Sequence, residues 1–594
     1  MELRHRSIGR RAAAWLAALV VAIGFGCGVA PSALAAPPLE RPASDSVAPP
    51  GYKLTADLAV RIASRGETIT AERGRHARFA PTAYTRGPGR WQVSWFDSKG
   101  DQVAQTRVDD ATGAILEEWT GDQVAWTMAR GYEGAFGRKL NAPYVWIPLC
   151  VLFLVPFVDP RRPFRIAHLD LLVLLGFGLS HVFFNRGEIG LSVPLVYPVL
   201  LYLLGRLLWV GFRAPERGGK LLPIVPMRWL LVALFLLVGF RIGLNVVDSN
   251  VIDVGYAGVI GADHIGDGER LYGEGFSERV EHGDTYGPLT YLLYLPFEQA
   301  MPWSGEWDSL PAAHGAAILF DLATLLGLIA LGRRLRGGSE GKELGVALGY
   351  AWVTYPYALF ALQTNSNDGL VAMCTVLAML ALTGFAGSPK SAGAARGAAV
   401  ALGAAAKFAP LVLAPVFARG TGGRPTGLAA FALSAAAVLA LLLLPFIPDG
   451  GPREIYDRTV GYQASRGSPF SVWGQVESLG WLQTVVKVAG LGLAVALFFL
   501  PRRRTPVQVA ALAAAVLIAV QLGVTHWFYL YVSWFAPLAL VAFLASLRPG
   551  PGLEDLGDAG GRAVGARLHE HGVQPRVLVG DFVSNVGHRE KARE

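Results

Sequence analysis

Long apolar runs constrain this chain more than any other feature of its sequence. From residue 141 onward they reach about 17–22 residues, the length an α-helix needs to cross the hydrocarbon core of a bilayer. Hydrophobic residues make up 52% of the 594 residues and charged residues 16%, whereas soluble domains carry about 25% charged residues. An ordinary soluble protein is therefore excluded. We predict an all-α polytopic membrane protein with about 12–13 transmembrane helices, preceded by a small extracytoplasmic α+β domain.

The individual spans are predicted from the positions of these runs. They lie near 142–158, 168–185, 190–211, 221–241, 311–332, 343–362, 368–386, 396–406, 409–418, 426–446, 482–500, 506–523 and 528–547.

Basic residues gather in the short loops between predicted spans, which marks those loops as cytoplasmic. They are Arg161, Arg162, Arg165, Arg213, Arg217, Lys220, Arg333, Arg334, Arg336, Lys390, Arg396, Arg419, Arg424, Arg502, Arg503 and Arg504. Their placement explains the net charge of +8. Since no basic patch is interleaved with aromatic residues, we expect no nucleic-acid partner.

Alternation across the membrane then places the remaining polar segments on the outer face. These are 245–286, 363–367, 449–479, 525–527 and Lys407. The parity holds only if 288–303 is a re-entrant or interfacial hairpin and 396–418 forms two short spans that break near Lys407 and Pro410. We therefore expect a plasma-membrane protein with its functional groups on the extracytoplasmic side.

The two ends of the chain have the composition of accessory segments. Residues 1–36 are predicted to be a signal peptide or signal anchor, with an arginine-rich start, an apolar stretch and Ala33-Leu34-Ala35 as a cleavage pattern. Residues 548–594 are glycine-rich and charged, typical of a mostly disordered cytoplasmic tail. The three cysteines are not placed for a disulfide or a metal cluster.

Residues 37–140 have the composition of a small extracytoplasmic module. Thr55 can cap a helix that runs to about Arg65, and strands are predicted over 91–96, 102–108 and 114–119 with a hairpin turn at 98–101. The pattern resembles a PepSY-type domain through Trp91, Val93, Gly100, Val108, Asp109, Thr112, Gly113 and Ile115. That resemblance implies a binding or regulatory role. The alternative is a featureless extracytoplasmic cap.

The outer segment 243–303 is predicted to be the catalytic loop, because loops this long and acidic between spans usually carry function. Asp253 opens it directly after a span, and on a helix it shares a face with Tyr256. A carboxylate at the membrane edge can take a proton from an attacking hydroxyl. Alternatively, Asp253 only caps the helix. Asp284 and His282, beside the Tyr286-Gly287-Pro288 turn, compete with Asp253 for the same role.

Other polar residues each allow a functional and a structural interpretation. Lys407 can stabilise an anionic leaving group or extend to the membrane surface. Arg453, Arg458, Arg466 and His526 are further candidates, with solvated loop charges as the alternative for the arginines. Trp473, Trp481 and Trp527 can stack on sugars or form an interfacial belt. The intramembrane Asp321 can line a substrate path or form a structural pair with Arg241 or Lys407.

Several of these motifs, taken in order over about residues 221–547, resemble superfamily C glycosyltransferases, and among them the polyprenyl-phosphate-mannose-dependent branch. The matching residues are Asp253, Tyr256, Gly268, Leu271, Tyr272, Tyr286, Pro288 and Leu289, followed by 365–368 (NSND), 406–411 (AKFAPL), 468–474 (SPFSVWG) and 526–529 (HWFY). Gln363-Thr364 replaces the usual Gly-Gln of the polar turn.

The resemblance implies an inverting membrane glycosyltransferase that moves a sugar, mannose for example, from a polyprenyl-phosphate donor to an extracytoplasmic lipid or glycan acceptor. It implies Asp253 as general base. The residues it implies for substrate binding are Tyr256, Asp284, Tyr286, Asn365, Asn367, Lys407, Arg458, Arg466, Trp473 and His526. The transferase region would be 221–547, preceded by extra helices over 141–220. No cofactor is required, although the acidic loops leave a divalent metal open.

Two other functions remain open at this stage. A secondary transporter can use Asp321, Arg241 and Lys407 as its ion or substrate site, but no repeated halves are seen. A non-catalytic membrane sensor can use the 51–130 module as a ligand-binding head.

Overall fold

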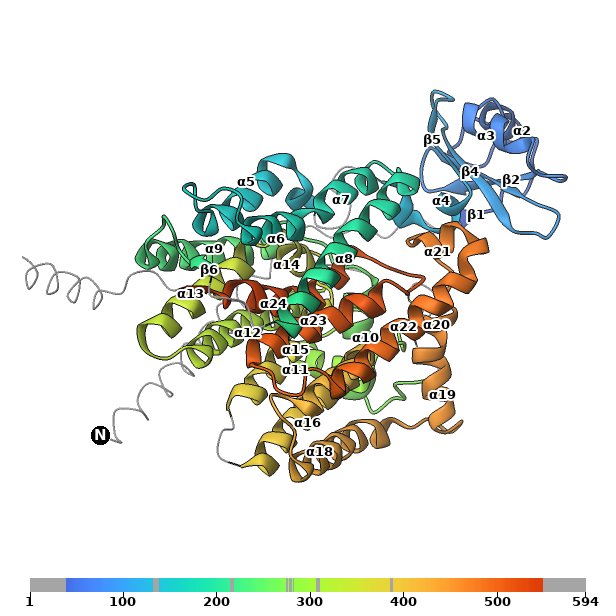
Figure 1. Cartoon of the computed structure of the whole chain (residues 1–594). Coiled ribbons are helices and arrows are strands. Elements are labelled where there is room, and N and C mark those ends of the chain that lie inside the picture. The colour runs from blue at the N-terminus through green and yellow to red at the C-terminus, as the bar shows by residue number, and fades with distance from the viewer. Residues whose placement is uncertain are drawn as a thin grey trace, which may run out of the picture.

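The computed structural model describes residues 39–548 apart from 132–137, 214–217, 274–275, 277–279, 281, 306–309 and 385–387. The expected leader 1–36, the tail after residue 548 and Arg217 lie outside the described residues. A helical bundle forms most of the structure, and a small sheet domain lies at one end of it (Figure 1). The predicted fold class is thereby confirmed.

The N-terminal domain is an antiparallel sheet of five strands in sequence order. The strands are β1 (Leu39–Glu40), β2 (Ala80–Arg86), β3 (Arg90–Phe96), β4 (Gln102–Asp109) and β5 (Ile115–Thr120), with the helices α2 (Ala56–Ala63) and α3 (Glu67–Arg73). The predicted helix and three strands are present, and Thr55 accepts a hydrogen bond from Leu58 N at 3.2 Å. The elements β1, β2 and α3 were not predicted from the sequence. The residues of β2 (APTAYTR) lack the apolar and β-branched or aromatic character of β3 (RWQVSWF).

Asp110 connects the segment before α2 to the sheet through hydrogen bonds. Its carboxylate accepts hydrogen bonds from Lys53 N at 2.7 Å, Leu54 N at 2.9 Å and Trp91 Nε1 at 2.9 Å. Trp91 is completely buried against the small residues of α2. The domain therefore has a core of its own, separate from that of the bundle.

The bundle follows the predicted spans closely. Its helices are α5 (Pro143–Leu154), α6 (Ile166–Leu175), α7 (Phe177–Asn185), α8 (Ile189–Phe212), α9 (Met227–Val247), α12 (Pro311–Leu335), α13 (Gly338–Thr354), α14 (Pro356–Gln363), α15 (Asp368–Gly384), α16 (Pro389–Lys407), α17 (Ala414–Arg419), α18 (Pro425–Leu443), α22 (Gly480–Phe499), α23 (Pro506–Gln521) and α24 (Val532–Leu544).

Among the described residues, six helices are long and apolar enough to cross a membrane, or seven if α13 and α14, bent by 57°, form one span. The other predicted spans correspond to apolar helices of 10–17 residues, except 396–406, which lies within the 19-residue helix α16. Large apolar side chains face outward, for example Phe235, which is 80% exposed, and Leu441, which is 73% exposed. An apolar exterior of this kind indicates contact with lipid. The chain is thus a multi-pass membrane protein.

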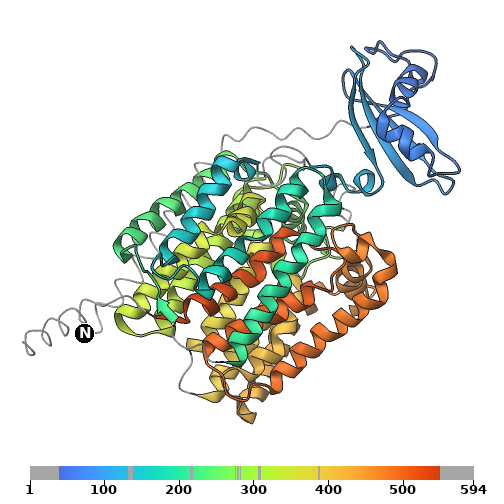
Figure 2. The ribbon, with the colours of Figure 1, turned by 45° about the horizontal axis from the view of Figure 1, so that its top comes forward.

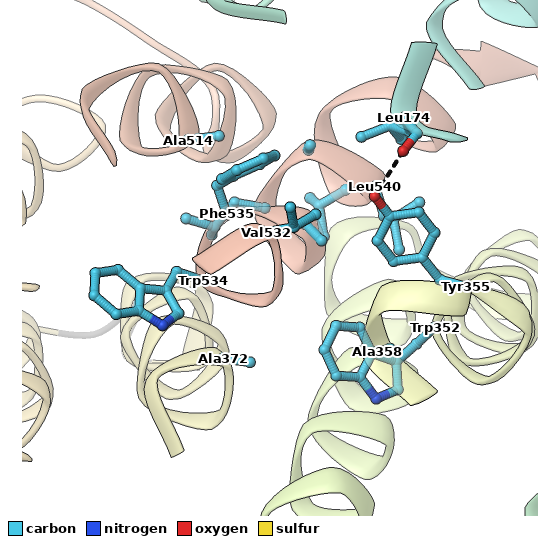
Figure 3. Packing of buried hydrophobic residues seen from close by; sticks show 14 of the residues in the cluster. Leu174, Trp352, Tyr355, Ala358, Ala372, Ala514, Val532, Trp534, Phe535 and Leu540 are labelled. Carbon is cyan, nitrogen blue, oxygen red and sulfur yellow. Dashed lines mark hydrogen bonds between the residues drawn. The ribbon is translucent and has the colours of Figure 1, made fainter. Parts of the chain in front are cut away.

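The centre of the bundle is α24, whose thirteen residues are all buried. Figure 3 shows Val532, Phe535 and Leu540 of α24 among residues of the surrounding helices, with Tyr355 donating a hydrogen bond to Leu174 O at 2.8 Å. A helix that is apolar on all sides is expected either in the core of a large protein or within a membrane, and α24 occupies a core position.

The loops sort to two ends of the bundle. At one end β6 (Gly218–Lys220) pairs with β7 (Leu547–Arg548), Arg336 donates to Ala545 O at 2.9 Å, and the predicted basic loops meet. At the other end lie α10 (Asp253–Gly266), α11 (Pro288–Ala300), α19 (Pro452–Tyr456), α20 (Tyr462–Ser465) and α21 (Val472–Gln475). Figure 1 shows α21 next to the N-terminal domain with α20 and α19 further from it, and Figure 2 shows this domain at the edge of the bundle.

The predicted break in the 396–418 region lies at Phe408, whose φ is +51°. Beyond it the chain returns through a 3-10 helix, η5 (Ala409–Leu413), and α17. Arg396 Nε donates to Phe417 O at 2.8 Å, so the return limb runs antiparallel to α16. This helix begins at Pro389, earlier than expected, and carries Lys407 at the tip of the turn.

The buried acid Asp321 pairs with Arg241, as the structural interpretation predicted. Arg241 Nη2 lies 2.5 Å from Asp321 Oδ1, which also accepts from Trp352 Nε1 at 2.9 Å. Arg241 additionally donates to Val353 O at 2.7 Å. The ion pair joins α9, α12 and α13 in the interior of the bundle.

Replacing Asp321 by Ala leaves Arg241 buried without its partner. Breaking a buried ion pair from one side costs about 3–5 kcal/mol, so D321A should lower the thermal unfolding midpoint in detergent well below that of the wild type. The double variant R241M/D321L removes both charges and should recover most of the loss. An unchanged midpoint for D321A would contradict the structural role.

Candidate functional site

The start of α10 is fixed by backbone pairing with the polar turn 363–368. Asn250 N donates to Gln363 O at 3.1 Å, and Ile252 N donates to Thr364 O at 3.2 Å. Ile252 is extended, and Asp253 is the first residue of the helix. Asp253 is therefore not the capping residue, and its carboxylate is held at the end of the bundle opposite the basic loops.

Asn365 stabilises the contact between the polar turn and the segment before α10 through its side-chain hydrogen bonds. It has a φ of +48°, and its side-chain nitrogen donates to Ser249 Oγ and Asn250 O, both at 3.0 Å. Its oxygen accepts from Asn245 Nδ2 at 2.9 Å. Because both ends of the amide are engaged and the residue is completely buried, Asn365 holds the loop that presents Asp253.

The second side of the site is the tip of α16. Lys407 Nζ lies 2.6 Å from Asp368 Oδ1, and the side chains of Lys407 and Asp368 are 7% and 2% exposed. Trp534 Nε1 donates to the same Asp368 oxygen at 2.7 Å. The ammonium group also lies 5.1 Å from the ring centroid of Tyr286. The charge of Lys407 is thus neutralised by Asp368, and its side chain is held in one orientation.

Tyr286 is positioned by the same tip. Gly287 N and Thr290 Oγ1 donate to Ala406 O at 2.8 and 2.9 Å. Tyr272 OH donates to Tyr286 O at 2.7 Å. The start of α11 is therefore bonded to the end of α16, which brings the Tyr286 ring under Lys407.

The third side comes from the segment 466–474 and the loop before α24. Arg466 follows α20, and its guanidinium carbon lies 4.9 Å from the ring centroid of Trp126. His526 Nδ1 lies 2.9 Å from Ser468 Oγ. Burial, and then the charges of Arg466 and Lys407, lower the pKa of His526 to about 3. At physiological pH this histidine is neutral and acts as a hydrogen-bonding group.

Asp253 lies among these charges. The residue is solvent-exposed, yet protein atoms surround its carboxylate closely enough to remove part of its hydration. That burial raises its pKa, and Asp368 raises it further, while Arg466, Val254 N and Lys407 oppose the rise. A carboxylate with a raised pKa and no ion-pair partner within 4.0 Å among the described residues is suited to accept a proton.

Asp284 and Arg458 pair with each other instead. Arg458 Nη1 lies 2.9 Å from Asp284 Oδ2, and Arg458 Nε donates to Glu454 Oε1 at 2.9 Å. They line a separate surface recess together with His282 and Tyr462, whose rings lie 4.0 Å apart. This pair connects the loop before α11 to α19.

Three further predicted residues are buried. Tyr256 is buried and packs edge-on against Trp303 at 5.9 Å. Trp473 donates from Nε1 to Leu522 O at 2.8 Å, and is too buried for an interfacial belt. Asn367 is completely buried, and neither side-chain polar atom has a hydrogen-bond partner in the described part of the chain.

The sequence analysis did not single out Asp368, Trp534 or Trp126 as site residues. Asp368 was visible only as the end of the NSND motif. Its place directly before an apolar helix, in a chain with an intramembrane lysine, was the available signal. Within the residues that the structure describes, no three His, Cys, Asp or Glu side chains are grouped for a metal ion.

At Gly255 the backbone of α10 is in close contact with the polar turn, because a Cβ on this residue would lie 2.4 Å from Asn365 O. Overpacking costs about 1–3 kcal/mol, so G255A should lower the thermal midpoint measurably. Gly239→Ala, on α9 with open space around it, is the matched control and should not. Equal midpoints for the two variants would show that the α10 start is not tightly packed.

Comparison with known proteins identifies one family. Residues 285–548 match the family model of glycosyltransferase family 87. The matched segment contains Tyr286, Asp368, Lys407, Arg466 and His526, and Asp253 precedes it. No curated protein and no solved structure matches the chain.

Proposed function

We propose that this chain, a membrane glycosyltransferase of family 87 by its residues 285–548, transfers a sugar from a polyprenyl-phosphate donor with Asp253 as general base. The observation that carries the proposal is the arrangement of Asp253. The residue is solvent-exposed, and its carboxylate lies within electrostatic reach of two cations, Arg466 and Lys407. A base beside cations is what the transfer of a sugar from a phosphate to a hydroxyl requires.

In this reaction the acceptor hydroxyl attacks the anomeric carbon from the face opposite the phosphate. The new C–O bond forms as the bond from the anomeric carbon to the phosphate oxygen breaks, and the phosphate leaves with the electron pair. Asp253 takes the hydroxyl proton. The polyprenyl phosphate gains one negative charge, which Arg466 and Lys407 stabilise. The anomeric configuration is inverted.

The two cations differ in how much of their charge is available. Lys407 is bound to Asp368 at 2.6 Å, whereas Arg466 makes no ion pair with any described residue. Arg458, also expected to bind substrate, is occupied by Asp284 and Glu454. We therefore assign the main phosphate contact to Arg466. Its planar guanidinium can form two parallel hydrogen bonds with phosphate oxygens.

The proposed donor follows from the position of the site. The basic loops gather at the other end of the bundle, and such loops are normally cytoplasmic, which supports an extracytoplasmic position for Asp253. Nucleotide sugars are not available there, so a lipid-linked sugar is the expected donor. The resemblance to the polyprenyl-phosphate-mannose branch makes mannose the first sugar to test, with a lipid or glycan acceptor.

The family match favours an enzyme over the transporter and sensor alternatives. It covers Lys407 and Asp321, two of the residues that a transport site would use. Both are already paired, with Asp368 and Arg241. We take these pairs as structural and keep glycosyl transfer as the proposed function.

Asp253→Asn removes the proton acceptor while keeping its shape. General base catalysis contributes about 10²–10⁴-fold, so transfer by purified protein in nanodiscs should fall by about that factor. Radiolabelled polyprenyl-phosphate mannose provides the readout. Asp267→Asn, at the exposed end of the same helix, is the matched control and should retain activity. Wild-type rates for D253N would remove Asp253 from the mechanism.

The pH dependence reports the environment of the base. Because burial raises the pKa of Asp253, kcat/KM should decline with falling pH above the ordinary aspartate pKa of about 3.9. Arg466 favours the ionised carboxylate, so R466Q should raise this pKa and move the acid limb to higher pH. An acid limb that stays in place in R466Q would mean that Arg466 does not act on the titrating group.

A further inference from the structure

Trp126 brings the N-terminal domain into the site. It lies between α4 (Asp122–Ala125) and the 3-10 helix η1 (Thr127–Arg130), which follow the last strand of the sheet. Its ring centroid lies 4.9 Å from the Arg466 guanidinium carbon, 5.6 Å from the His526 ring and 5.4 Å from the Phe470 ring. Three residues of the family-matched segment thus surround one residue of the preceding domain.

The segment that carries Trp126 is bonded to the sheet on one side. Arg130 Nε donates to Gln123 O at 2.7 Å, and Arg130 Nη2 donates to Val124 O at 3.2 Å and to Gln105 Oε1 of β4 at 3.3 Å. The guanidinium of Arg130 also lies 5.7 Å from the Trp119 ring of β5. Trp126 is therefore fixed relative to the sheet.

The same segment is bonded to the bundle on its other side. Gln123 Nε2 donates to Ala129 O and to Gly187 O, both at 3.1 Å. A Cβ on Gly131 would lie 2.2 Å from Gly187 N, and one on Gly187 would lie 2.6 Å from Arg130 O. Both glycines have positive φ. The backbones touch between α7 and α8, so the domain is docked there.

Arg466 depends on this contact for its direction. It has no ion-pair partner among the described residues, and the Trp126 ring is the group on which its guanidinium rests. A flat aromatic face attracts a cation through its electron density without neutralising the charge. Such a support leaves the guanidinium edge free for a phosphate, which a carboxylate partner would not.

We propose that the N-terminal domain contributes a residue to the transfer site. Trp126 is this positioning residue, and it orients Arg466 toward the donor phosphate. This inference rests on the proposed function. It assigns to the domain a role that the family-matched segment cannot supply, because residue 126 lies outside it. Binding of the lipid phosphate then depends on docking of the domain at Gly187.

The test compares variants of Trp126 in the full-length protein. Trp126→Leu keeps an apolar contact with Phe470 but has no aromatic face, and Trp126→Phe restores one. We expect W126L to raise the KM for polyprenyl-phosphate mannose about tenfold, with kcat changed much less, and W126F to recover most of that loss. Trp229→Leu, at a tryptophan of α9 that is 59% exposed, is the matched control.

A second measurement separates positioning from general stability. Binding of farnesyl phosphate, a short polyprenyl phosphate without sugar, should weaken in W126L and in R466A. In the double variant W126L/R466A the effects should not add, because both residues act through one contact. Thermal midpoints are measured in parallel, and R466A supplies the binding comparison independently if W126L fails to fold.

The outcomes distinguish this inference from the proposed function. If the wild type transfers sugar and W126L has an unchanged KM, or the two losses add fully, the role of Trp126 is wrong and the transferase proposal stands. If the wild type transfers nothing but binds farnesyl phosphate in a Trp126-dependent way, the proposed donor chemistry is wrong and the anion site stands. If the wild type does neither, both are overturned.

Discussion

The ion pair between Lys407 and Asp368 is the interaction on which the rest of the site depends. A buried lysine charge without a partner would cost free energy. Asp368 at the start of α15 pairs with Lys407 at the tip of α16, and Trp534 of α24 donates a hydrogen bond to the same carboxylate. From there the Ala406 carbonyl holds the start of α11, and the polar turn holds the start of α10. The geometry of the candidate site thus follows from the way the bundle neutralises the charge of Lys407.

Much of the polar sequence at this end of the bundle serves to connect loops rather than to contact substrate. Asn365 joins the chain before α10 to the turn, and Asp284 with Arg458 joins the loop before α11 to α19. These connections leave few ionisable groups for chemistry. An outer region rich in charge therefore contains a small functional centre, in which Asp253 and Arg466 are the groups without close ionic partners among the described residues.

The sequence predicted the bundle, the break near Lys407 and Pro410, and a structural pair of Asp321 with either Arg241 or Lys407, because apolar run length, proline and the cost of buried charge are local or pairwise signals. The structure selects Arg241 as the partner. The sequence also brought Asp253, Lys407 and Arg466 to one face through loop parity. It did not predict that Asp284 would be taken by Arg458, or that Trp126 would reach Arg466. Both contacts join segments more than a hundred residues apart. The charge of a residue alone does not indicate which of several oppositely charged or aromatic residues it will contact.

The hairpin of α16 and its short return limb has a consequence for the surrounding lipid. Eleven residues of α-helix separate Arg396, beside Phe417, from Lys407, which corresponds to about 16 Å. A hydrocarbon core is about 30 Å thick. If Arg396 lies at the level of the basic loops, the paired charges of Lys407 and Asp368 lie within the hydrocarbon layer, and a polar substrate of the proposed reaction would have to enter a local depression of the leaflet. Acyl-chain length and membrane thickness would then contribute to the rate of the proposed transfer.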